Sequence, residues 1–152
     1  MSIVALLEEG ALQPEHELAA LMQQASGAGA VVSFIGLARA ASKGGDSIDR
    51  LDLEHHPALT LRSLQDISSE AAARFEVSDV RVIHRCGEVA AGEAIVFAGA
   101  ASKHRRGAFK AADYLMDRLK TEAVFWKREV GQAGSQWIEP TDADYADRER
   151  WV

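Results

Sequence analysis

The hydrophobic and polar positions of the chain change their period several times, and these changes predict strands that alternate with helices. Residues 30–36 (AVVSFIG) are apolar and rich in β-branched side chains, which is typical of a buried strand. Residues 50–54 alternate Leu51 and Leu53 with charged neighbours, which predicts a half-buried strand. Shorter apolar runs predict three further strands, at residues 3–7, 80–84 and 94–100.

Three segments carry apolar residues at helical spacing. Pro14 begins the first, because proline is favoured in the first turn of a helix. The second begins at Pro57 and continues to Phe75. The third follows Ser102, a candidate N-cap, and its apolar face consists of Ala108, Ala112, Leu115 and Leu119.

The remaining segments read as loops, turns and a hairpin. Residues 40–47 contain two adjacent glycines and predict a loop, and glycines 87 and 92 mark a turn. Residues 125–130 can pair with residues 136–138 across a glycine-containing turn. The pattern therefore predicts one mixed α+β domain over residues 1–152, in which residues 136–152 form a C-terminal strand and tail.

Composition narrows the class of protein. The chain has 152 residues, of which 47% are hydrophobic and 26% charged, as in an ordinary globular domain. No apolar run is long enough for a membrane span, and the N-terminus lacks the basic region of a signal peptide. Cys86 is the single cysteine, which excludes an internal disulfide and a cysteine-based zinc site. We expect a soluble, cytoplasmic protein.

The charge of the chain is unevenly distributed. The net charge is −6, which argues against general binding of nucleic acid. Residues 103–128 nevertheless hold eight basic and three acidic side chains, a local charge of +5. This asymmetry favours a small anionic ligand or an acidic protein partner, and its alternative is a solvated helix face.

Two groups within the basic segment can carry chemistry. His104 and Arg105 stand where a strand ends and a helix begins, so free backbone N–H groups and cations converge there on a possible anion. Lys120 and Lys127 lie close to Arg128, and crowding by other cations lowers the pKa of a lysine and makes a neutral amine available. The alternative for both groups is a solvent-exposed set of cations near a helix terminus.

Other candidate sites receive less support. Cys86 follows His84 and Arg85, which could activate the thiol, but a small residue at a strand end is the simpler interpretation. His55 and His56 are adjacent and would point to opposite faces of a strand, which argues against a shared metal ion. Neither a G-x-S-x-G elbow nor a P-loop is present. We expect no metal and no cofactor.

A set of short motifs occurs in a fixed order between residues 30 and 137. They are Phe34-x-Gly36-x-x-Arg39, Leu53-Glu54-His55, Val82-Ile83-His84-Arg85-x-Gly87-Glu88, Gly92-Glu93, Ser102-x-His104-Arg105-x-x-Ala108-Phe109 and Leu119-Lys120 followed by Phe125-Trp126-Lys127-Arg128-Glu129. The ordered set resembles the large, catalytic subunit of molybdopterin synthase. The chain departs from the family pattern at Ala38, His56 and Val124, which changes no charged residue of the motifs.

The resemblance implies a fold, an activity and partners. The family fold is an α/β hammerhead with an additional antiparallel β subdomain. Its members convert the cyclic pyranopterin monophosphate called precursor Z into molybdopterin by adding two sulfurs as a dithiolene, with no cofactor at this step. The sulfur arrives as a thiocarboxylate on the C-terminal Gly-Gly of a small ubiquitin-like subunit. Two large subunits form a central homodimer, and each carries one small subunit in a heterotetramer.

The resemblance also assigns site residues by position. Lys120 and Lys127 would be the catalytic lysines. The substrate pocket would consist of Leu37, Ala38, Arg39, His104, Arg105, Arg128 and Glu129. A non-catalytic module that binds an acidic C-terminal tail or a phosphorylated ligand would use the same cations, and substitution of Lys120 separates the two hypotheses.

The length of the third helix adds a geometric constraint. Sixteen residues separate His104 from Lys120, which at 1.5 Å per residue is about 24 Å along a continuous helix. This distance is too long for both side chains of one protomer to contact one pterin-sized ligand. We therefore predict composite sites, in which His104 and Arg105 of one protomer face Lys120 and Lys127 of the other.

Overall fold

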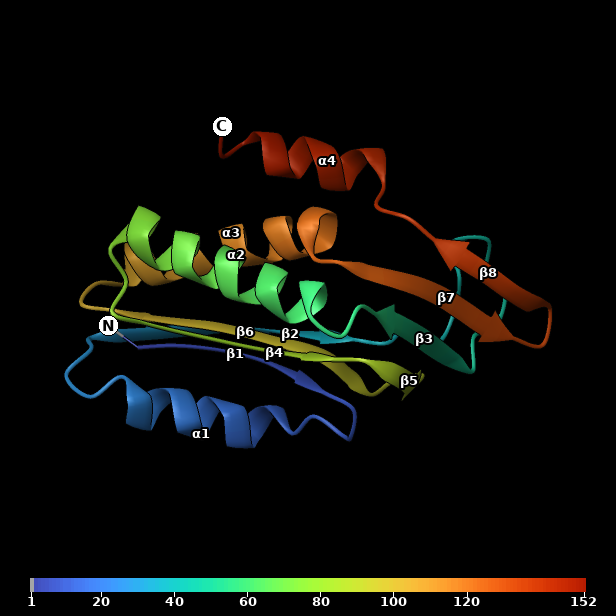
Figure 1. The fold of residues 1–152 in the computed structure, drawn as a ribbon, viewed down its shortest axis with the longest axis horizontal. Coiled ribbons are helices and arrows are strands. Elements are labelled where there is room, and N and C mark those ends of the chain that lie inside the picture. The colour runs from blue at the N-terminus through green and yellow to red at the C-terminus, as the bar shows by residue number, and fades with distance from the viewer. Residues whose placement is uncertain (1) are drawn as a thin grey trace.

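The computed structural model describes residues 2–152, which form two four-stranded sheets and four helices (Figure 1). The larger sheet has the order β1 (Ser2–Glu8), β4 (Asp79–Arg85), β6 (Ala94–Ser102) and β2 (Ala30–Leu37), in which only β1 and β4 pair in parallel. The smaller sheet is fully antiparallel, in the order β5 (Gly87–Ala90), β3 (Arg50–His55), β7 (Phe125–Gly131) and β8 (Gly134–Ile138). The predicted α+β class and the additional antiparallel sheet are confirmed.

Helices cover both faces of the larger sheet (Figure 1). Helix α1 (Pro14–Gln24) lies on one face, and α2 (Leu59–Phe75) and α3 (Arg105–Glu122) lie on the other. Helix α4 (Asp142–Glu149) follows the smaller sheet and returns over α3. None of these helices is long and apolar enough to cross a membrane.

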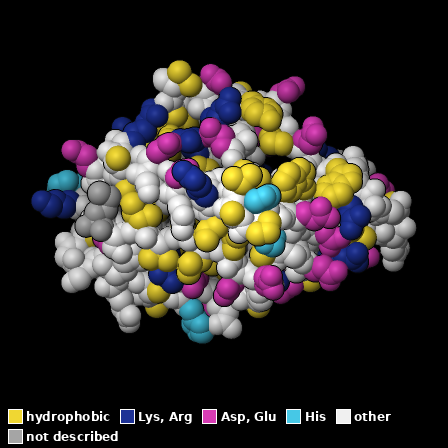
Figure 2. All heavy atoms as spheres, viewed as in Figure 1, with side chains coloured by type: hydrophobic (Ala, Val, Ile, Leu, Met, Phe, Trp, Pro, Cys, Tyr) yellow, Lys and Arg dark blue, Asp and Glu magenta, His cyan; other side chains and the backbone are white. Residues whose placement is uncertain are grey.

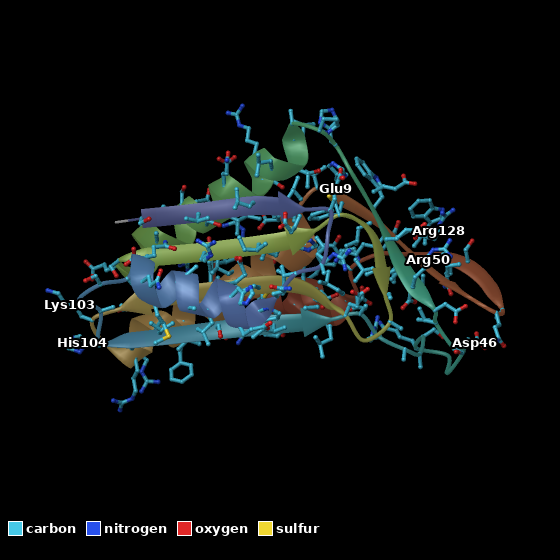
Figure 3. The ribbon with its side chains drawn as sticks, turned by 90° about the horizontal axis from the view of Figure 1, so that it is seen from below. Glu9, Asp46, Arg50, Lys103, His104 and Arg128 are labelled. Atoms are coloured by element: carbon cyan, nitrogen blue, oxygen red, sulfur yellow. The ribbon has the colours of Figure 1, made fainter. Side chains whose placement is uncertain are left out.

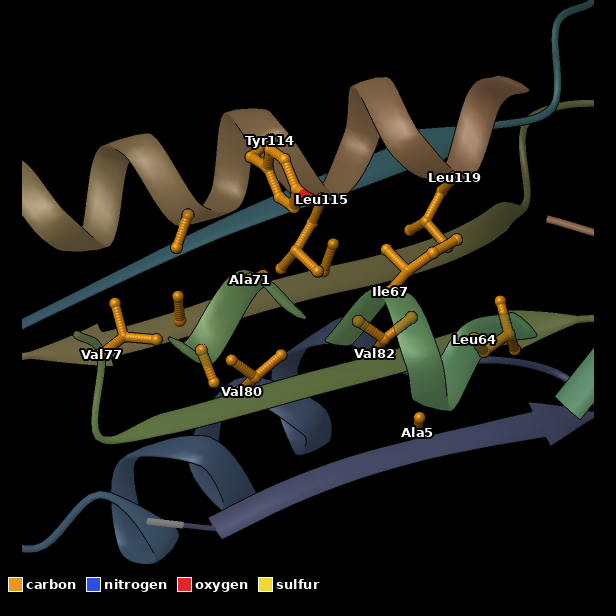
Figure 4. Packing of buried hydrophobic residues seen from close by; sticks show 14 of the residues in the cluster. Ala5, Leu64, Ile67, Ala71, Val77, Val80, Val82, Tyr114, Leu115 and Leu119 are labelled. Carbon is orange, nitrogen blue, oxygen red and sulfur yellow. The ribbon is translucent and has the colours of Figure 1, made fainter. Parts of the chain in front are cut away.

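The central strands β4 and β6 build two cores because alternate residues point to opposite faces. On one face, Val80 and Val82 pack with Leu64 of α2 and Leu115 of α3 (Figure 4). On the other face, Phe97 packs with Leu21 of α1. A third cluster joins Leu51, Leu53 and Val89 of the smaller sheet to Ala38.

Three local predictions were wrong. Residues 30–36 form a strand as predicted, but β2 is an edge strand, and its side chains Phe34, Ile35 and Leu37 are 42%, 37% and 58% exposed. The predicted turn between glycines 87 and 92 contains β5, which was too short to show a period. Ser102 ends β6 instead of capping α3, whose N-cap is His104.

The C-terminal region is more ordered than the sequence indicated. The predicted hairpin is confirmed, since β7 pairs with β8 from Lys127 opposite Ile138 to Gly131 opposite Gly134. Beyond it the structure has a helix, α4, where we predicted only a tail. Helix α4 has no fully buried residue, so its sequence lacks the apolar stripe by which a helix is recognised.

Candidate active site

Lys127 stands on the inner face of the smaller sheet. On β7 it lies opposite Leu53 of β3, whose side chain is buried, and it shares its face with Phe125 and Glu129. Trp126 and Arg128 occupy the other face of the strand. The alternation of β7 therefore directs the amine of Lys127 inward and leaves its neighbours outside.

The surroundings of Lys127 lower its pKa to about 8 from the usual 10.5. The largest cause is burial of the ammonium group, followed by repulsion from Lys120, with a smaller repulsion from Arg39. Asp144 acts in the opposite direction and raises the pKa. Three predicted site residues thus converge from three elements: Lys127 from β7, Lys120 from the end of α3 and Arg39 from the segment after β2.

The segment after β2 is held in place through its backbone. The Ala38 N–H donates to the carbonyl of Glu93 at 2.8 Å, and the Ala38 carbonyl accepts from the Gly92 N–H at 2.8 Å. Its methyl group is buried among the inner residues of the smaller sheet, while Leu37 and Arg39 on either side are exposed. This anchoring fixes the backbone that precedes Arg39, whose side chain is exposed.

Gly36 lets the chain pass closely over β6 before it reaches Arg39. A Cβ at this position would lie 2.8 Å from the Val96 side chain, so a larger residue would force the strands apart. The register between β2 and β6 also shifts between Gly36 and Leu37. Packing of β2 against β6 is therefore sufficient to require glycine at position 36 of the Phe34-x-Gly36-x-x-Arg39 motif.

Arg128 lies on the sheet face opposite Lys127. Its Nη2 donates to Asp52 Oδ2 at 2.9 Å, and its guanidinium stands 5.3 Å from the centre of the exposed Trp137 ring. Glu129 is on the face of Lys127, but two positions further along β7, where it lines a hollow of about 110 Å³ with Gly131 and Gln136. Figure 2 shows acidic and basic side chains side by side over the smaller sheet.

His104 and Arg105 are far from the lysines within one chain. Both are exposed at the start of α3, which continues unbroken from Arg105 to Glu122. Figure 3 places His104 at one end of the molecule and Arg128 of the smaller sheet at the other. The structure therefore confirms that this helix is continuous, as we assumed when we estimated the distance between His104 and Lys120.

Two neighbours of the lysines were not identified as site residues from the sequence. His84 is buried at the end of β4, where its Nδ1 lies 2.8 Å from the Arg85 carbonyl oxygen and its ring stacks on Phe125 with centroids 4.2 Å apart. Burial lowers the pKa of His84 to about 3, so the imidazole is neutral and Nδ1 carries the proton donated to Arg85. Asp144 of α4 is the second, and it comes from the tail that showed no helical pattern.

The surroundings of Cys86 disfavour an activated cysteine. Cys86 is buried, and burial together with the charge of Glu9 raises the pKa of its thiol, which disfavours the thiolate. His56 also has a structural role, because its Nδ1 accepts from the backbone N–H groups of Ala58 and Leu59 at the start of α2. Among residues 2–152, no cluster of three or more His, Cys, Asp and Glu side chains is arranged to hold a metal ion.

Comparisons with known proteins show which family the chain resembles. The chain matches the family model described as "MoaE protein" over residues 7–122. It is 50% identical over 123 residues to the molybdopterin synthase catalytic subunit of Caulobacter vibrioides, which covers 81% of this chain and 80% of that protein.

Solved structures agree in fold over nearly the whole chain. The molybdopterin biosynthesis MoaE protein from Burkholderia ambifaria has a TM-score of 0.81 at 32% identity, with 99% of this chain and 97% of that one covered. A complex of subunits 1 and 2 of the molybdopterin-converting factor from Helicobacter pylori has a TM-score of 0.71 at 20% identity, with 92% and 90% covered. The second likeness concerns the fold alone.

Proposed function

Because the chain belongs to the family of molybdopterin synthase catalytic subunits, we propose that it transfers sulfur to precursor Z, a cyclic pyranopterin monophosphate, and so forms the dithiolene of molybdopterin. The sulfur comes from the C-terminal thiocarboxylate of a small ubiquitin-like subunit. The observation that carries the proposal is the convergence of Lys120, Lys127 and Arg39, with the pKa of Lys127 held near 8. An amine with that pKa holds or releases a proton near neutral pH, as acid–base catalysis requires.

We assign different roles to the two lysines. In each transfer the thiocarboxylate sulfur bonds to a substrate carbon in place of an oxygen substituent, and water then cleaves the resulting thioester, so that the small subunit leaves as a carboxylate. Lys127 donates a proton to the departing substrate oxygen. Lys120, exposed at the end of α3, stabilises the oxyanion of the tetrahedral intermediate that water forms at the thioester.

The remaining cations hold anions in place. Arg39, whose charge acts on Lys127, is suited to the phosphate or to the incoming carboxyl end of the small subunit. We assign Leu37, Ala38 and Glu129 to the wall of the substrate pocket, with Glu129 on the same face of β7 as Lys127. Arg128 is paired with Asp52 on the other face, so we assign it to shaping that face and to the approach of the small subunit.

We further propose that the site is composite. His104 and Arg105 cannot reach the lysines of their own chain, because α3 separates them by about 24 Å. The exposed edge strand β2 offers a surface for a second copy, since its backbone is unpaired on one side and Ile35 and Leu37 are exposed. A homodimer would place His104 and Arg105 of one protomer beside the lysines of its partner, and two small subunits would complete a heterotetramer.

A mixing experiment tests the composite site. Chains with Lys120→Ala and chains with His104→Ala are each expected to be inactive as homodimers, because every site then lacks one group. Each mixed dimer, formed by refolding the two variants together, contains one intact site of two. Because half of the dimers are mixed, the refolded mixture should recover about a quarter of the native activity. Absence of recovery in dimers shown to be mixed would contradict the proposal.

Reconstitution tests the function itself. Purified chain, precursor Z and thiocarboxylated small subunit should yield the dithiolene product, and a small subunit that ends in an ordinary carboxylate should yield none. A non-catalytic binding module would form a complex with the small subunit and make no product from either form.

A further inference from the structure

Helix α4 presents a single half-buried carboxylate, that of Asp144. A reciprocal pair of hydrogen bonds fixes it: the Asp144 N–H donates to Thr141 Oγ1 at 3.1 Å, and the Thr141 N–H donates to Asp144 Oδ2 at 2.9 Å. Asp142, in the same first turn, is exposed. The position of Asp144 is therefore set by the capping of the helix and does not depend on a flexible side chain.

The C-terminal end of α4 is anchored on α3. Trp151 Nε1 and Arg150 Nη2 both donate to Asp117 Oδ2 at 2.6 Å, and Arg150 also reaches Asp113 at 3.1 Å. The Trp151 ring meets the edges of Phe75 and Tyr114 at centroid distances of 5.4 and 5.5 Å. Because these contacts hold the last residues of the chain against α3, they fix the direction in which α4 runs over α3.

The direction of α4 places Asp144 over the end of α3. The two helices run antiparallel, since α4 returns from the smaller sheet toward the middle of α3 (Figure 1). Asp144 precedes the anchor at Arg150 by six residues, and Lys120 follows the anchor at Asp117 by three. The carboxylate and Lys120 therefore lie on the same side of the anchor.

The other end of α4 begins beside Lys127. Ile138 of β8 pairs directly with Lys127, and α4 begins only four residues later. The charge of Asp144 raises the pKa of Lys127. Burial opposes the ionised form of Asp144, but the hydrogen bond from the Thr141 N–H and the charge of Lys120 lower the pKa of Asp144 overall.

The charged and titratable groups around Lys127 come from every element packed against it. Lys120 of α3 and Arg39 of the segment after β2 are cations, and His84 of β4 is neutral. Two carboxylates belong to this region: Glu129, two positions further along the same face of β7, and Asp144 of α4, which is the one that raises the pKa of Lys127. Without the Asp144 carboxylate, burial and the two neighbouring cations would lower the pKa of Lys127 further.

We propose that Asp144 is a positioning residue of the lysine site, whose carboxylate, held in place by the capping of α4, supplies the negative charge that the Lys127 amine faces. The importance of this role for turnover rests on the proposed function, since Lys127 must carry a proton in order to donate one. The charge interaction itself is a property of the free protein.

Asp144→Asn tests the charge with little change in structure. The asparagine Oδ1 can still accept from the Thr141 N–H, so the capping interaction is retained. Asp142→Asn is the matched control, because it makes the same change of net charge in the same turn at an exposed position. Lys127 is titrated by NMR through ¹³Cε-labelled lysine, and its signal is assigned by its loss in Lys127→Met.

The expected result is that Lys127 titrates at lower pH in Asp144→Asn than in the native protein and keeps its native titration in Asp142→Asn. An unchanged titration in Asp144→Asn, or an equal displacement in both variants, would overturn the proposal. Asp144→Glu should restore most of the native titration if the charge is what matters.

The activity of the complete complex gives a second readout. The alkaline limb of kcat should move to lower pH in Asp144→Asn, with KM for the small subunit changed by less than about twofold. A merely structural role would lower kcat equally at all pH values. The NMR titration needs no substrate, so a native protein that makes no dithiolene would overturn the proposed function, whereas an unmoved Lys127 titration would overturn only the role of Asp144.

Discussion

At the scale of single residues, the site depends on how one amine is desolvated. Lys127 could be selected from the sequence because Lys120 and Arg128 stand nearby and two aromatic residues precede it. In the structure Lys120 is one of the cations that lower the pKa of Lys127, as predicted, but the second is Arg39 and not Arg128. Alternation along β7 places Arg128 on the other face of the sheet. Asp144 and His84 escaped the sequence analysis because only the folded chain brings them to the lysines.

Because burial of the Lys127 ammonium group costs free energy, we predict that removing this group stabilises the protein while it abolishes activity. Lys127→Met should abolish turnover and raise Tm at pH 7, because an apolar side chain of similar length removes the cost of burying an ammonium group. A lysine whose pKa is lowered on folding destabilises the native state fully below about pH 8, and this effect declines as pH rises toward 10.5.

Thermal unfolding at several pH values measures how the charge of Lys127 affects stability. The difference in Tm between Lys127→Met and the native chain should be largest below pH 8 and should shrink toward pH 10.5. A difference that is constant over this range would show that packing, and not the ammonium charge, accounts for it.

At the scale of elements, strongly periodic segments were predictable and short or polar ones were not. The apolar face of α3 and the alternation of β3 both appear in the structure as the sequence indicates. Strand β5 has four residues with only Val89 buried, and α4 has no buried residue. Neither segment therefore shows a periodic pattern of hydrophobic residues in the sequence. We predicted a buried strand at β2, but β2 lies at the edge of its sheet. The amino-acid composition of an edge strand can equal that of a central strand, so the sequence did not distinguish the two.

Helix α4 is held by tertiary contacts rather than by its own sequence, which predicts a strong effect of Trp151. Trp151→Ala removes the ring from Phe75 and Tyr114 and the hydrogen bond to Asp117, and should lower the free energy of unfolding by about 2–3 kcal/mol. Urea unfolding measures the loss.

The same variant should detach α4 and so weaken the effect of Asp144 on Lys127. Arg148→Ala is the control on the same helix, since the charged group of Arg148 pairs with the exposed Glu149 and lies over the Tyr145 ring, both within the same helix. Equal losses of stability in the two variants would contradict the anchoring role of Trp151.

At the scale of the whole molecule, the two groups of cations lie at opposite ends of one rigid helix. The sequence predicted this separation from helix length alone, and the unbroken α3 agrees with it. It could not indicate which surface pairs with a second copy, because that depends on the position of β2 at the edge of its sheet. If the two groups of cations serve one site, as we propose, a second chain must bring them together.

If Lys120 takes part in catalysis, its removal should lower turnover far more than it lowers binding of the small subunit. Dithiolene formation from precursor Z and thiocarboxylated small subunit is measured with the native chain, with Lys120→Ala and with Lys110→Ala, an exposed lysine of the same helix. We predict that Lys120→Ala lowers turnover by about 100-fold or more, while still binding the small subunit, and that Lys110→Ala stays within about twofold of native. Equal turnover in the native and Lys120→Ala chains would contradict the account.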